Sequence, residues 1–396
     1  MDNKNEQAGG VRLIPGMPVL GLMLTVFVVN MTSRSILSPL LLRVEHDFAV
    51  SHGPAAQLFL FIGIGYSVAM LFSGFVSSQS THRGAIFISA VVMAAGLLFM
   101  SLAPTMLMMR AGVLLMGAGS GLYPPSSIAT ITGHFDRRDW QKALSIHEIG
   151  PHLAMVLAPL YANFILRFAG WRAAVGLLSG IILVAGSIFF FSIDAGKMKG
   201  EAPTLNALLP LFREPNFWIL MLFFGLALGS IQGIYLLVPT FLVTEAGFSL
   251  EGANSIFSIS RFLPIVALLT AGLLMDRLGL RRTLLLTLAG AGLSIVLMGL
   301  LRGSLLVAAV FLQPTIGALF FPAGLAALAN VGPPQSRNVA VSMVLPVSAL
   351  LGTGLIPAFL GYMGDVLTFS AGFLIVGAAI TLASLLAVFI TVAESE

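Results

Sequence analysis

The stretch DAGKMKGEAPTLNALLPLFRE, residues 194–214, is the longest polar segment between apolar runs and lies near the middle of the 396-residue chain. A membrane-spanning helix needs about 20 mostly apolar residues. Six apolar runs of that length precede this stretch and six follow it. The sequence therefore predicts an all-α membrane protein with twelve transmembrane helices, over residues 17–42, 55–77, 84–103, 105–132, 141–168, 171–193, 215–243, 252–275, 280–300, 304–329, 337–362 and 368–392.

The composition fits a chain that lies in lipid. Hydrophobic residues make up 58% of the sequence, the mean hydropathy is +1.00, and charged residues contribute 9%, against about 25% in an ordinary soluble domain. The absence of cysteine excludes disulfides and thiolate metal sites. A net charge of +4 could point to nucleic acid, but the basic residues follow membrane topology instead. These features exclude a soluble enzyme and a disordered regulator, and we expect no cofactor and no nucleic-acid partner.

The basic residues also predict the orientation. If the N-terminus is cytoplasmic, 13 Lys and Arg residues lie on the cytoplasmic side and 5 on the outer side. Cytoplasmic loops of membrane proteins carry such an excess of Lys and Arg. The first apolar run is too long for a signal peptide, so we expect it to remain as a span. We therefore expect a multi-pass protein of the cell (inner) membrane with both termini in the cytoplasm.

The chain repeats itself at half its length. A shift of about 198 residues places Gly74 on Gly272, and each of them opens the loop after the second span of its half. Repeated bundles are typical of transporters, whose substrate sites lie between the repeats. We therefore predict two pseudo-symmetric six-helix bundles with a central site: an N-terminal half over residues 1–193, a cytoplasmic linker over 194–214 and a C-terminal half over 215–396.

The loop between predicted spans eight and nine reads GLLMDRLGLRR, residues 272–282. It resembles the signature G-x-x-x-D-R-x-G-x-R-R of the major facilitator superfamily, at the place of the family's second copy. The resemblance implies the major facilitator fold, with an acid that caps a neighbouring helix and arginines that hold the cytoplasmic gate through charge pairs. The gating residues would be Asp276, Arg277, Arg281 and Arg282. The first copy, GFVSSQSTHR over residues 74–83, has Ser78 where the acid is expected, so a charge-based gate would be asymmetric.

Three further segments resemble the organophosphate antiporter and anion:cation symporter branches of that superfamily. They are an arginine within span one (Arg34 to Pro39), a glycine-rich span four with its loop (Gly117 to Arg138), and the H-x-x-G pattern of span five (His147 to Gly150). The organophosphate branch places that histidine in its substrate cavity and carries a second arginine in span seven. Ile231 stands at that second position in this chain, so the sequence lacks a phosphate-clamping arginine pair of that kind.

Ionisable side chains well inside the predicted spans, away from the span ends, form a short set: Arg34, Arg261, Glu148, His147 and His152. Placing such a group at the bilayer centre is costly, so each is a candidate functional residue. The arginines come from opposite halves, and a guanidinium offers paired donors that fit a carboxylate or phosphate. Arg34 and Arg261 could therefore hold an anion at the pseudo-symmetry axis, or they could pair with internal carbonyls or with Glu148. One acid for two guanidinium groups favours the anion.

Glu148 and the histidines could carry a proton. Glu148 and His152 are four residues apart and share a helix face, while His147 points roughly 100° away. Imidazole titrates near neutral pH, and a partly buried carboxylate can do so too. Either group could carry the proton of a symport cycle, and a protonated Glu148 would free an arginine for substrate. The alternative is a static Glu-His or Glu-Arg bond between packed spans.

The segment from His147 to His152 has a superficial likeness to the H-E-x-x-H zinc motif. Zinc binding needs histidines at i and i+4, and residue i+4 here is Pro151. We therefore predict no metal site. Seven polar residues could add hydrogen bonds around a substrate, or could bond between helices instead: Asn30, Gln57, Tyr66, Tyr123, Gln232, Tyr235 and Gln313.

These observations predict a secondary active transporter and not an enzyme. It would move a small organic anion of the carboxylate type by alternating access, coupled to protons, as a monomer in the lipid bilayer. Two alternatives stay open. A proton-driven exporter of drugs or lipophilic compounds would suit a bend at Gly150-Pro151, and would predict an apolar cavity and tolerance of Arg261→Ala. A non-transporting membrane sensor would keep the fold without turnover.

Overall fold

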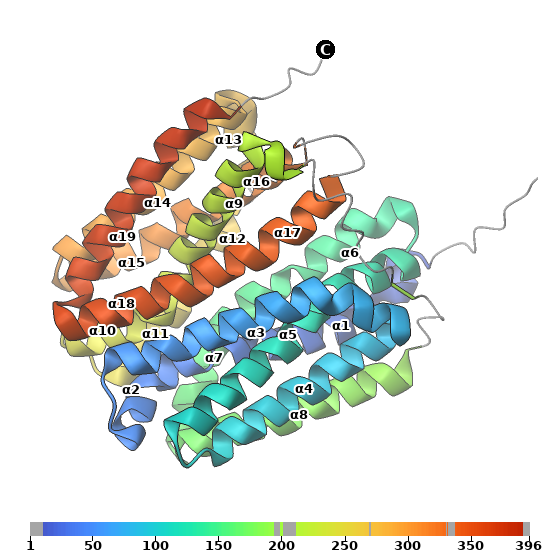
Figure 1. The fold of residues 1–396 in the computed structure, drawn as a ribbon, viewed down its shortest axis with the longest axis horizontal. Helices are drawn as coiled ribbons and strands as arrows, with labels where there is room; N and C mark the ends of the chain where they lie inside the picture. The colour runs from blue at the N-terminus through green and yellow to red at the C-terminus, as the bar shows by residue number, and fades with distance from the viewer. Residues whose placement is uncertain are drawn as a thin grey trace, which may run out of the picture.

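The computed structural model describes residues 11–193, 199–200, 211–268, 271–329, 331 and 337–390, and these form a bundle of long helices that run side by side (Figure 1). The described residues contain no β-strand, although an isolated bridge joins Val11 to Phe135. Most of the predicted linker, residues 194–214, lies outside the described residues.

The helices fall into two sets along the chain. The N-terminal set comprises α1 (Leu13–Ser35), α2 (Leu37–Phe48), α3 (His52–Gln79), α4 (His82–Leu102), α5 (Met106–His134), η1 (Arg137–Asp139), α6 (Trp140–His147), α7 (Ile149–Leu166) and α8 (Trp171–Ser192). The C-terminal set begins with η3 (Leu211–Arg213), α9 (Pro215–Leu228), η4 (Gly229–Gly233), η5 (Ile234–Leu236), α10 (Val238–Thr244), α11 (Leu250–Ser260), α12 (Phe262–Leu268) and α13 (Ala271–Leu278). It continues with α14 (Leu280–Leu300), α15 (Gly303–Ala318), α16 (Phe320–Leu328), α17 (Arg337–Ala349), η7 (Leu350–Leu355), α18 (Ile356–Val366), α19 (Phe369–Ser384) and η8 (Leu385–Phe389).

Eleven helical segments within the described residues are long and apolar enough to cross a membrane. They coincide with eleven of the twelve predicted spans, which confirms an all-α, integral multi-pass membrane protein. Predicted span eight, residues 252–275, is not among them, because residues 269–270 lie outside the described residues. Helices α11 and α12 precede those two residues, and α13 follows them.

At four places a single residue separates two α-helices within one predicted span, and proline explains each of these breaks. Proline has no N–H and its ring clashes with the carbonyl of residue i−4, so a helix cannot run through it undisturbed. Each break lies three residues before a proline. The break residues are Ile36, Glu148, Arg261 and Leu319. Two of the candidate ionisable residues are thus themselves at breaks, where backbone carbonyls have lost their helical partners.

Within each set the helices pack closely: α5 lies against α3 and α4, and α14 lies against α15 and α19. The two sets meet mainly where α3 contacts α17, η7 and α18, and where α7 contacts α11 (Figure 1). Small residues let α3 and its neighbours approach, as at Gly63, where an added Cβ would lie 3.2 Å from the Cα of Gly354. Glycine contacts of this kind are typical of membrane helix pairs.

The two ends of the bundle differ. We call the end where the described chain begins at Val11 and stops at Ile390 the terminal end, and the end with the loops at 49–51, 167–170, 245–249 and 367–368 the far end. Among the described residues, hydrogen bonds between the two sets run from mid-span, as from Ser67 to the Pro346 carbonyl, to the far end. None of them lies at the terminal end, so the halves are joined at the far end.

Candidate functional site

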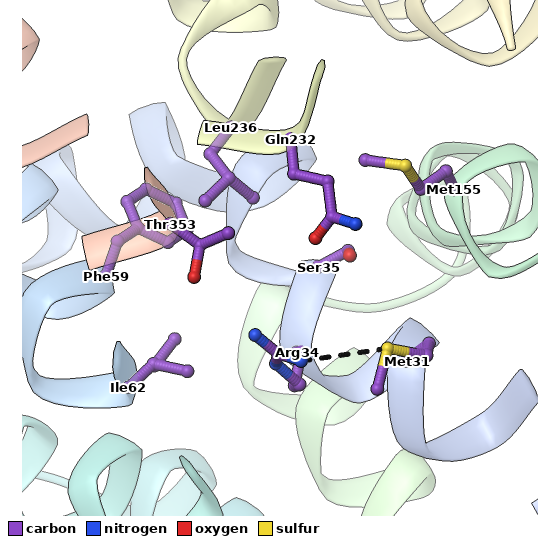
Figure 2. Close-up of a pocket in the computed structure, with 9 residues that line it drawn as sticks. All are labelled: Met31, Arg34, Ser35, Phe59, Ile62, Met155, Gln232, Leu236 and Thr353. Carbon is purple, nitrogen blue, oxygen red and sulfur yellow. Dashed lines mark hydrogen bonds between the residues drawn. The ribbon is translucent and has the colours of Figure 1, made fainter. Parts of the chain in front are cut away.

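A small cavity lies between the two sets of helices (Figure 2). Six of the residues that line it come from the N-terminal set and three from the C-terminal set: Met31, Arg34, Ser35, Phe59, Ile62 and Met155, then Gln232, Leu236 and Thr353. Its volume is about 30 Å³, on a scale on which a water molecule needs roughly 10–15 Å³. The cavity has room for a compact group and is placed where both sets contribute to its wall.

Arg34 gives the cavity its charge. It lies in the last turn of α1, just before the break at Ile36, and its guanidinium carbon is 4.0 Å from the centroid of the Tyr66 ring. Its Nη1 donates a weak hydrogen bond to the Met31 sulfur at 3.8 Å. A guanidinium is attracted to an aromatic face, but neither contact neutralises it. No carboxylate pairs with Arg34 within the described part of the chain.

Two π-helical turns form the C-terminal wall of the cavity. Gln232 belongs to η4 and Thr353 to η7. The two turns touch through glycine, because a Cβ on Gly233 would lie 2.0 Å from the Gly352 carbonyl oxygen. Short π-helical insertions are frequent at functional sites. Figure 2 shows the Gln232 amide projecting from this wall toward Arg34.

Arg261 lies behind that wall and does not line the cavity. Only 4% of the residue is exposed, and its Nη1 donates to the Ile231 carbonyl of η4 at 2.7 Å. Its guanidinium carbon is 3.5 Å from the Tyr235 ring centroid and 5.0 Å from that of Phe257. Its Nε and Nη2 are buried without a hydrogen-bond partner among the described residues. Residue 231 is isoleucine and not the second arginine of the organophosphate branch. In the structure, Arg261 of span eight reaches the backbone of Ile231 instead.

Glu148 lies at the break between α6 and α7, and 61% of its side chain is exposed. Its Oε1 is 3.6 Å from His147 Nδ1, and it forms no ion pair with either arginine in the part of the chain that the structure describes. His152, one turn further along α7, is partly buried and lies within electrostatic reach of both Arg261 and Glu148. A static Glu-Arg bond, one of the two sequence alternatives, is therefore not formed here.

His147 is buried against two rings. Its imidazole stacks on Phe27 with the centroids 4.4 Å apart, and its Nε2 is 2.9 Å from the Tyr123 hydroxyl. That hydroxyl donates to the Met23 carbonyl, also at 2.9 Å. A phenol has one proton to donate, so a bond from Nε2–H to the Tyr123 oxygen satisfies both contacts. In that tautomer the lone pair of Nδ1 faces Glu148.

The other predicted polar residues divide between the cavity and the helix contacts. Gln232 lines the cavity and Tyr66 carries Arg34 on its ring. Asn30 accepts a hydrogen bond from Ser120 at 2.6 Å, and Tyr235 donates to the Val310 carbonyl. Gln313 is fully buried, and its amide nitrogen and oxygen both lack a partner among the described residues.

The sequence analysis did not identify the apolar and small residues that line the cavity. The internal repeat could have identified two of these, Met155 and Thr353. The repeat shift of 198 residues takes Arg34 to Gln232 and Met155 to Thr353. All four residues line the cavity. A search of the repeat partners of Arg34 and of the span-five residues would have located the C-terminal wall.

The predicted gating residues lie at the terminal end, where α13 meets α14, and their side chains are exposed: Asp276, Arg277, Arg281 and Arg282. Arg281 donates through Nε to the Ile390 carbonyl at 2.6 Å. Within the described residues, none of the four forms an ion pair.

Membrane-crossing helices in two sets, with a charged cavity between them, define the class of multi-pass membrane transporters. The family model of the Major Facilitator Superfamily matches residues 23–263 and 251–396, so the chain belongs to that family of transporters, which are not enzymes. The resemblance found in the loop signature is thereby confirmed.

The curated relatives include anion transporters. The nitrite extrusion protein of Bacillus subtilis is 19% identical over 288 residues, which cover 72% of this chain and 69% of that protein. The probable nitrate transporter NarT of Staphylococcus aureus is 22% identical over 223 residues, which cover 56% of each chain. The chain therefore matches a little over half of NarT and about two thirds of the Bacillus protein.

Solved structures confirm the fold. A bacterial homolog of the human lysosomal transporter Spinster, in an inward-facing and unoccupied conformation, superposes with a TM-score of 0.78 at 16% identity, covering 96% of this chain and 99% of that one. The D-xylose-proton symporter gives a TM-score of 0.79 at 14% identity, with 95% and 98% covered. At such identities the similarity concerns the fold alone.

Proposed function

We propose that this protein is a secondary active transporter of a small planar oxyanion, which binds at Arg34 in the cavity between the two halves. The observation that carries the proposal is the unneutralised guanidinium of Arg34 in a cavity walled by both halves. A charge in a membrane protein interior is retained when it has a partner or a function. A transported anion would supply the missing partner.

The substrate class follows from charge, shape and size. A guanidinium binds planar oxyanions through paired hydrogen bonds, and carboxylate, nitrate and nitrite share that planar, delocalised charge. The volume of about 30 Å³ favours a compact anion over a sugar phosphate. The sequence alone favoured a carboxylate, and the names of the relatives add the nitrogen oxyanions to the same class.

Arg261 would support this site from behind. Its bond to the Ile231 carbonyl holds the turn that carries Gln232, and its charge adds to the positive potential of the cavity. Its free Nε and Nη2 groups give it unused donors. We propose that Arg261 reaches the anion in conformations in which η4 moves.

Proton coupling would use the pair of Glu148 and His147, with His152 close by. A proton between Glu148 Oε1 and His147 Nδ1 would join the two groups, which lie 3.6 Å apart. Glu148 is exposed at the break in span five, and the proposed cycle requires that this exposed side faces water, with which Glu148 would exchange its proton. Uptake of an anion together with a proton would then carry no net charge for a monovalent substrate.

The two halves, residues 1–193 and 215–396, would rock against each other about the cavity, joined by the linker 194–214. With both termini in the cytoplasm, the far end would face outward, and the hydrogen bonds that join the halves there would make the described conformation inward-facing. Closure of the terminal end would bring Asp276 and the arginines Arg277, Arg281 and Arg282 into their gating contacts. A monomer suffices for this cycle.

Tracer uptake and recordings of the internal pH in reconstituted liposomes test the proposal. We would compare formate, acetate, lactate, nitrate, nitrite, a sugar phosphate and a lipophilic cation at pH 5.5 and 7.5. Signals from planar oxyanions that vanish in Arg34→Ala, and persist in Arg43→Ala at an exposed arginine of α2, are the expected result.

The other outcomes decide between the alternatives. Signals from the lipophilic cation alone, unchanged in Arg34→Ala, would assign the protein to the exporters. Oxyanion signals that are equal at both pH values and insensitive to Glu148→Gln would remove the proton from the cycle. Binding without any uptake in a folded protein would favour the membrane sensor.

A further inference from the structure

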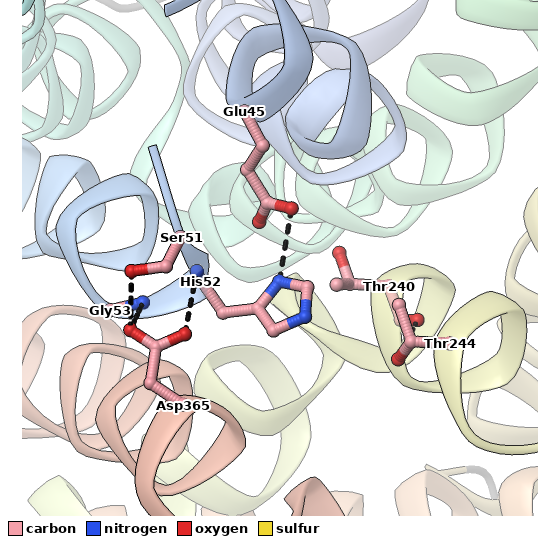
Figure 3. Close-up of polar contacts among 7 residues, drawn as sticks. All are labelled: Glu45, Ser51, His52, Gly53, Thr240, Thr244 and Asp365. Carbon is pink, nitrogen blue, oxygen red and sulfur yellow. Dashed lines mark hydrogen bonds and ion pairs between the residues drawn. The ribbon is translucent and has the colours of Figure 1, made fainter. Parts of the chain in front are cut away.

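We propose that Asp365 is the latch of the far end: a carboxylate of the C-terminal set that caps the first turn of α3 in the N-terminal set and has to release it whenever that end opens. This latch depends on alternating access but not on the identity of the anion. Asp365 lies near the end of α18, whereas the cavity residue Thr353 belongs to η7, which precedes that helix. Figure 3 shows the residues of the latch, none of which lines the cavity.

The Asp365 carboxylate occupies the N-terminus of α3. It accepts hydrogen bonds from the backbone N–H groups of His52 at 2.9 Å and Gly53 at 2.8 Å, and from the Ser51 hydroxyl at 2.7 Å. The first N–H groups of a helix have no partner within it and carry partial positive charge. Ser51, at the N-cap position, makes no side-chain bond to its own helix. The acid of the other half therefore does the capping.

Two glycines make room for this contact. A Cβ on Gly53 would lie 2.7 Å from the Asp365 carboxylate oxygen. A Cβ on Gly361, one turn before Asp365 on α18, would lie 2.2 Å from the Ala56 Cβ and 2.8 Å from the His52 carbonyl oxygen. Helices α18 and α3 touch at backbone distance here. The carboxylate can reach the N–H groups because both helices lack a side chain at the point of contact.

The residues around the latch separate into contacts that cross between the halves and contacts that do not. His52 Nδ1 is 2.9 Å from the nearly buried Glu45 carboxylate, and both residues belong to the N-terminal set. The His52 ring also packs on Phe369 of α19, with the centroids 5.0 Å apart. Opening of the far end would break the Asp365 bonds and the Phe369 contact, and would leave the Glu45–His52 pair intact.

A second carboxylate at the same end provides a matched control. Glu245 accepts hydrogen bonds from the backbone N–H groups of Phe369 and Ser370 and from the Ser370 hydroxyl. It caps α19 with the same number and kind of bonds as Asp365 makes to α3. Glu245 and its partners all belong to the C-terminal set, so this cap stays closed while the halves move.

Distance measurements between spin labels test the latch. The native chain has no cysteine, so labels can be placed freely. One pair, Leu102→Cys with Leu305→Cys, lies at exposed far-end positions, and a second, Ser145→Cys with Leu325→Cys, lies toward the terminal end. Both pairs would be measured by double electron–electron resonance in lipid nanodiscs, without substrate, in the native background and in the Asp365→Asn and Glu245→Gln backgrounds.

Asp365→Asn removes the charge and turns one acceptor oxygen into a donor that faces other donors. We expect the open-to-closed ratio at the far end to rise roughly tenfold. The terminal-end pair should move closer in the same variant, and Glu245→Gln should leave both distributions unchanged. Equal shifts in the two variants would mean general loosening, and unchanged distances in a folded Asp365→Asn protein would mean that no latch exists.

A milder variant covers the case in which Asp365→Asn does not fold. Ser51→Ala removes one of the three bonds from an exposed residue that does not cap its own helix. The far-end ratio should then shift in the same direction by about threefold. Far-end distances that stay at their native values in Ser51→Ala would overturn the latch independently. Because no anion is present in these measurements, the result does not depend on the proposed substrate.

Discussion

Arg34 and Arg261 come from opposite halves, lie at or beside a helix break, and stack on a tyrosine ring, yet their guanidinium groups have different surroundings. Arg34 faces the cavity, where it lies over the Tyr66 ring and donates a weak hydrogen bond to the Met31 sulfur. Arg261 is 96% covered and is bonded to the Ile231 carbonyl in the cavity wall.

The difference shows two uses of a charge inside a membrane protein. A guanidinium without a partner in a cavity is available to a ligand, because the ligand can replace the water that the guanidinium lost on burial. A guanidinium bonded to a carbonyl stabilises backbone that would otherwise be unsatisfied in a dry interior. We therefore expect Arg34 to govern binding, and Arg261 to govern the geometry and stability of the wall.

Arg34→Ala should have the largest effect on transport. Uptake of the oxyanion into proteoliposomes should fall by roughly 100-fold, since the anion loses its only unpaired cationic partner in the cavity. The thermal unfolding temperature should stay close to native, because Arg34 holds no backbone group. Initial rates from tracer uptake and unfolding followed by intrinsic fluorescence measure the two effects.

Arg34→Lys separates charge from shape at the same position. It keeps the charge and loses the planar pair of donors, so uptake should recover only in part. Full recovery would show that the cavity needs a positive charge alone, and a loss of folding in Arg34→Ala would remove the contrast with Arg261.

Arg261→Ala should act mainly on stability. It leaves the Ile231 carbonyl without its partner, which costs about 1–3 kcal/mol for a buried acceptor. Transport should fall by roughly tenfold, because the turn that carries Gln232 loses its support. Thermal unfolding and uptake should therefore decrease together. A variant with native unfolding and abolished uptake would make Arg261 a direct substrate ligand in this conformation.

The contrast between the arginines could be predicted from the sequence only in part. Apolar length predicted the spans, and the loop at 272–282 predicted the family, because both are local signals. Proline positions also fix the breaks at Glu148 and Arg261 by a local rule. The direction in which Arg261 points depends on where the break between α11 and α12 lies relative to η4, which is set by contacts between residues 30 apart. Such tertiary contacts leave no pattern in a single sequence.

Gly233→Ala tests the contact between η4 and η7 in the C-terminal wall of the cavity. The added Cβ would lie 2.0 Å from the Gly352 carbonyl oxygen, so η4 and η7 would have to separate. Crowding of this kind costs about 1–3 kcal/mol, and transport should fall by a few-fold as Gln232 and Thr353 move. Gly21→Ala serves as the control, since nothing lies within 4 Å of a Cβ at Gly21. Native uptake and unfolding in Gly233→Ala would mean that the two π-helical turns do not have to touch.

The tyrosines beneath the two guanidinium groups give the smallest and most direct comparison. Tyr66→Leu and Tyr235→Leu each remove one cation–π contact, worth about 0.5–2 kcal/mol. Under Arg34 this should weaken apparent substrate affinity by a few-fold and leave unfolding unchanged, because the ring orients a group that binds ligand. Under Arg261 it should lower the unfolding temperature, since the ring and its hydroxyl, bonded to Val310, hold the wall. Tyr66→Phe keeps the ring and should behave as native. If both leucine variants changed affinity alike, the two arginines would share one role, and the distinction between a binding charge and a supporting charge would fail.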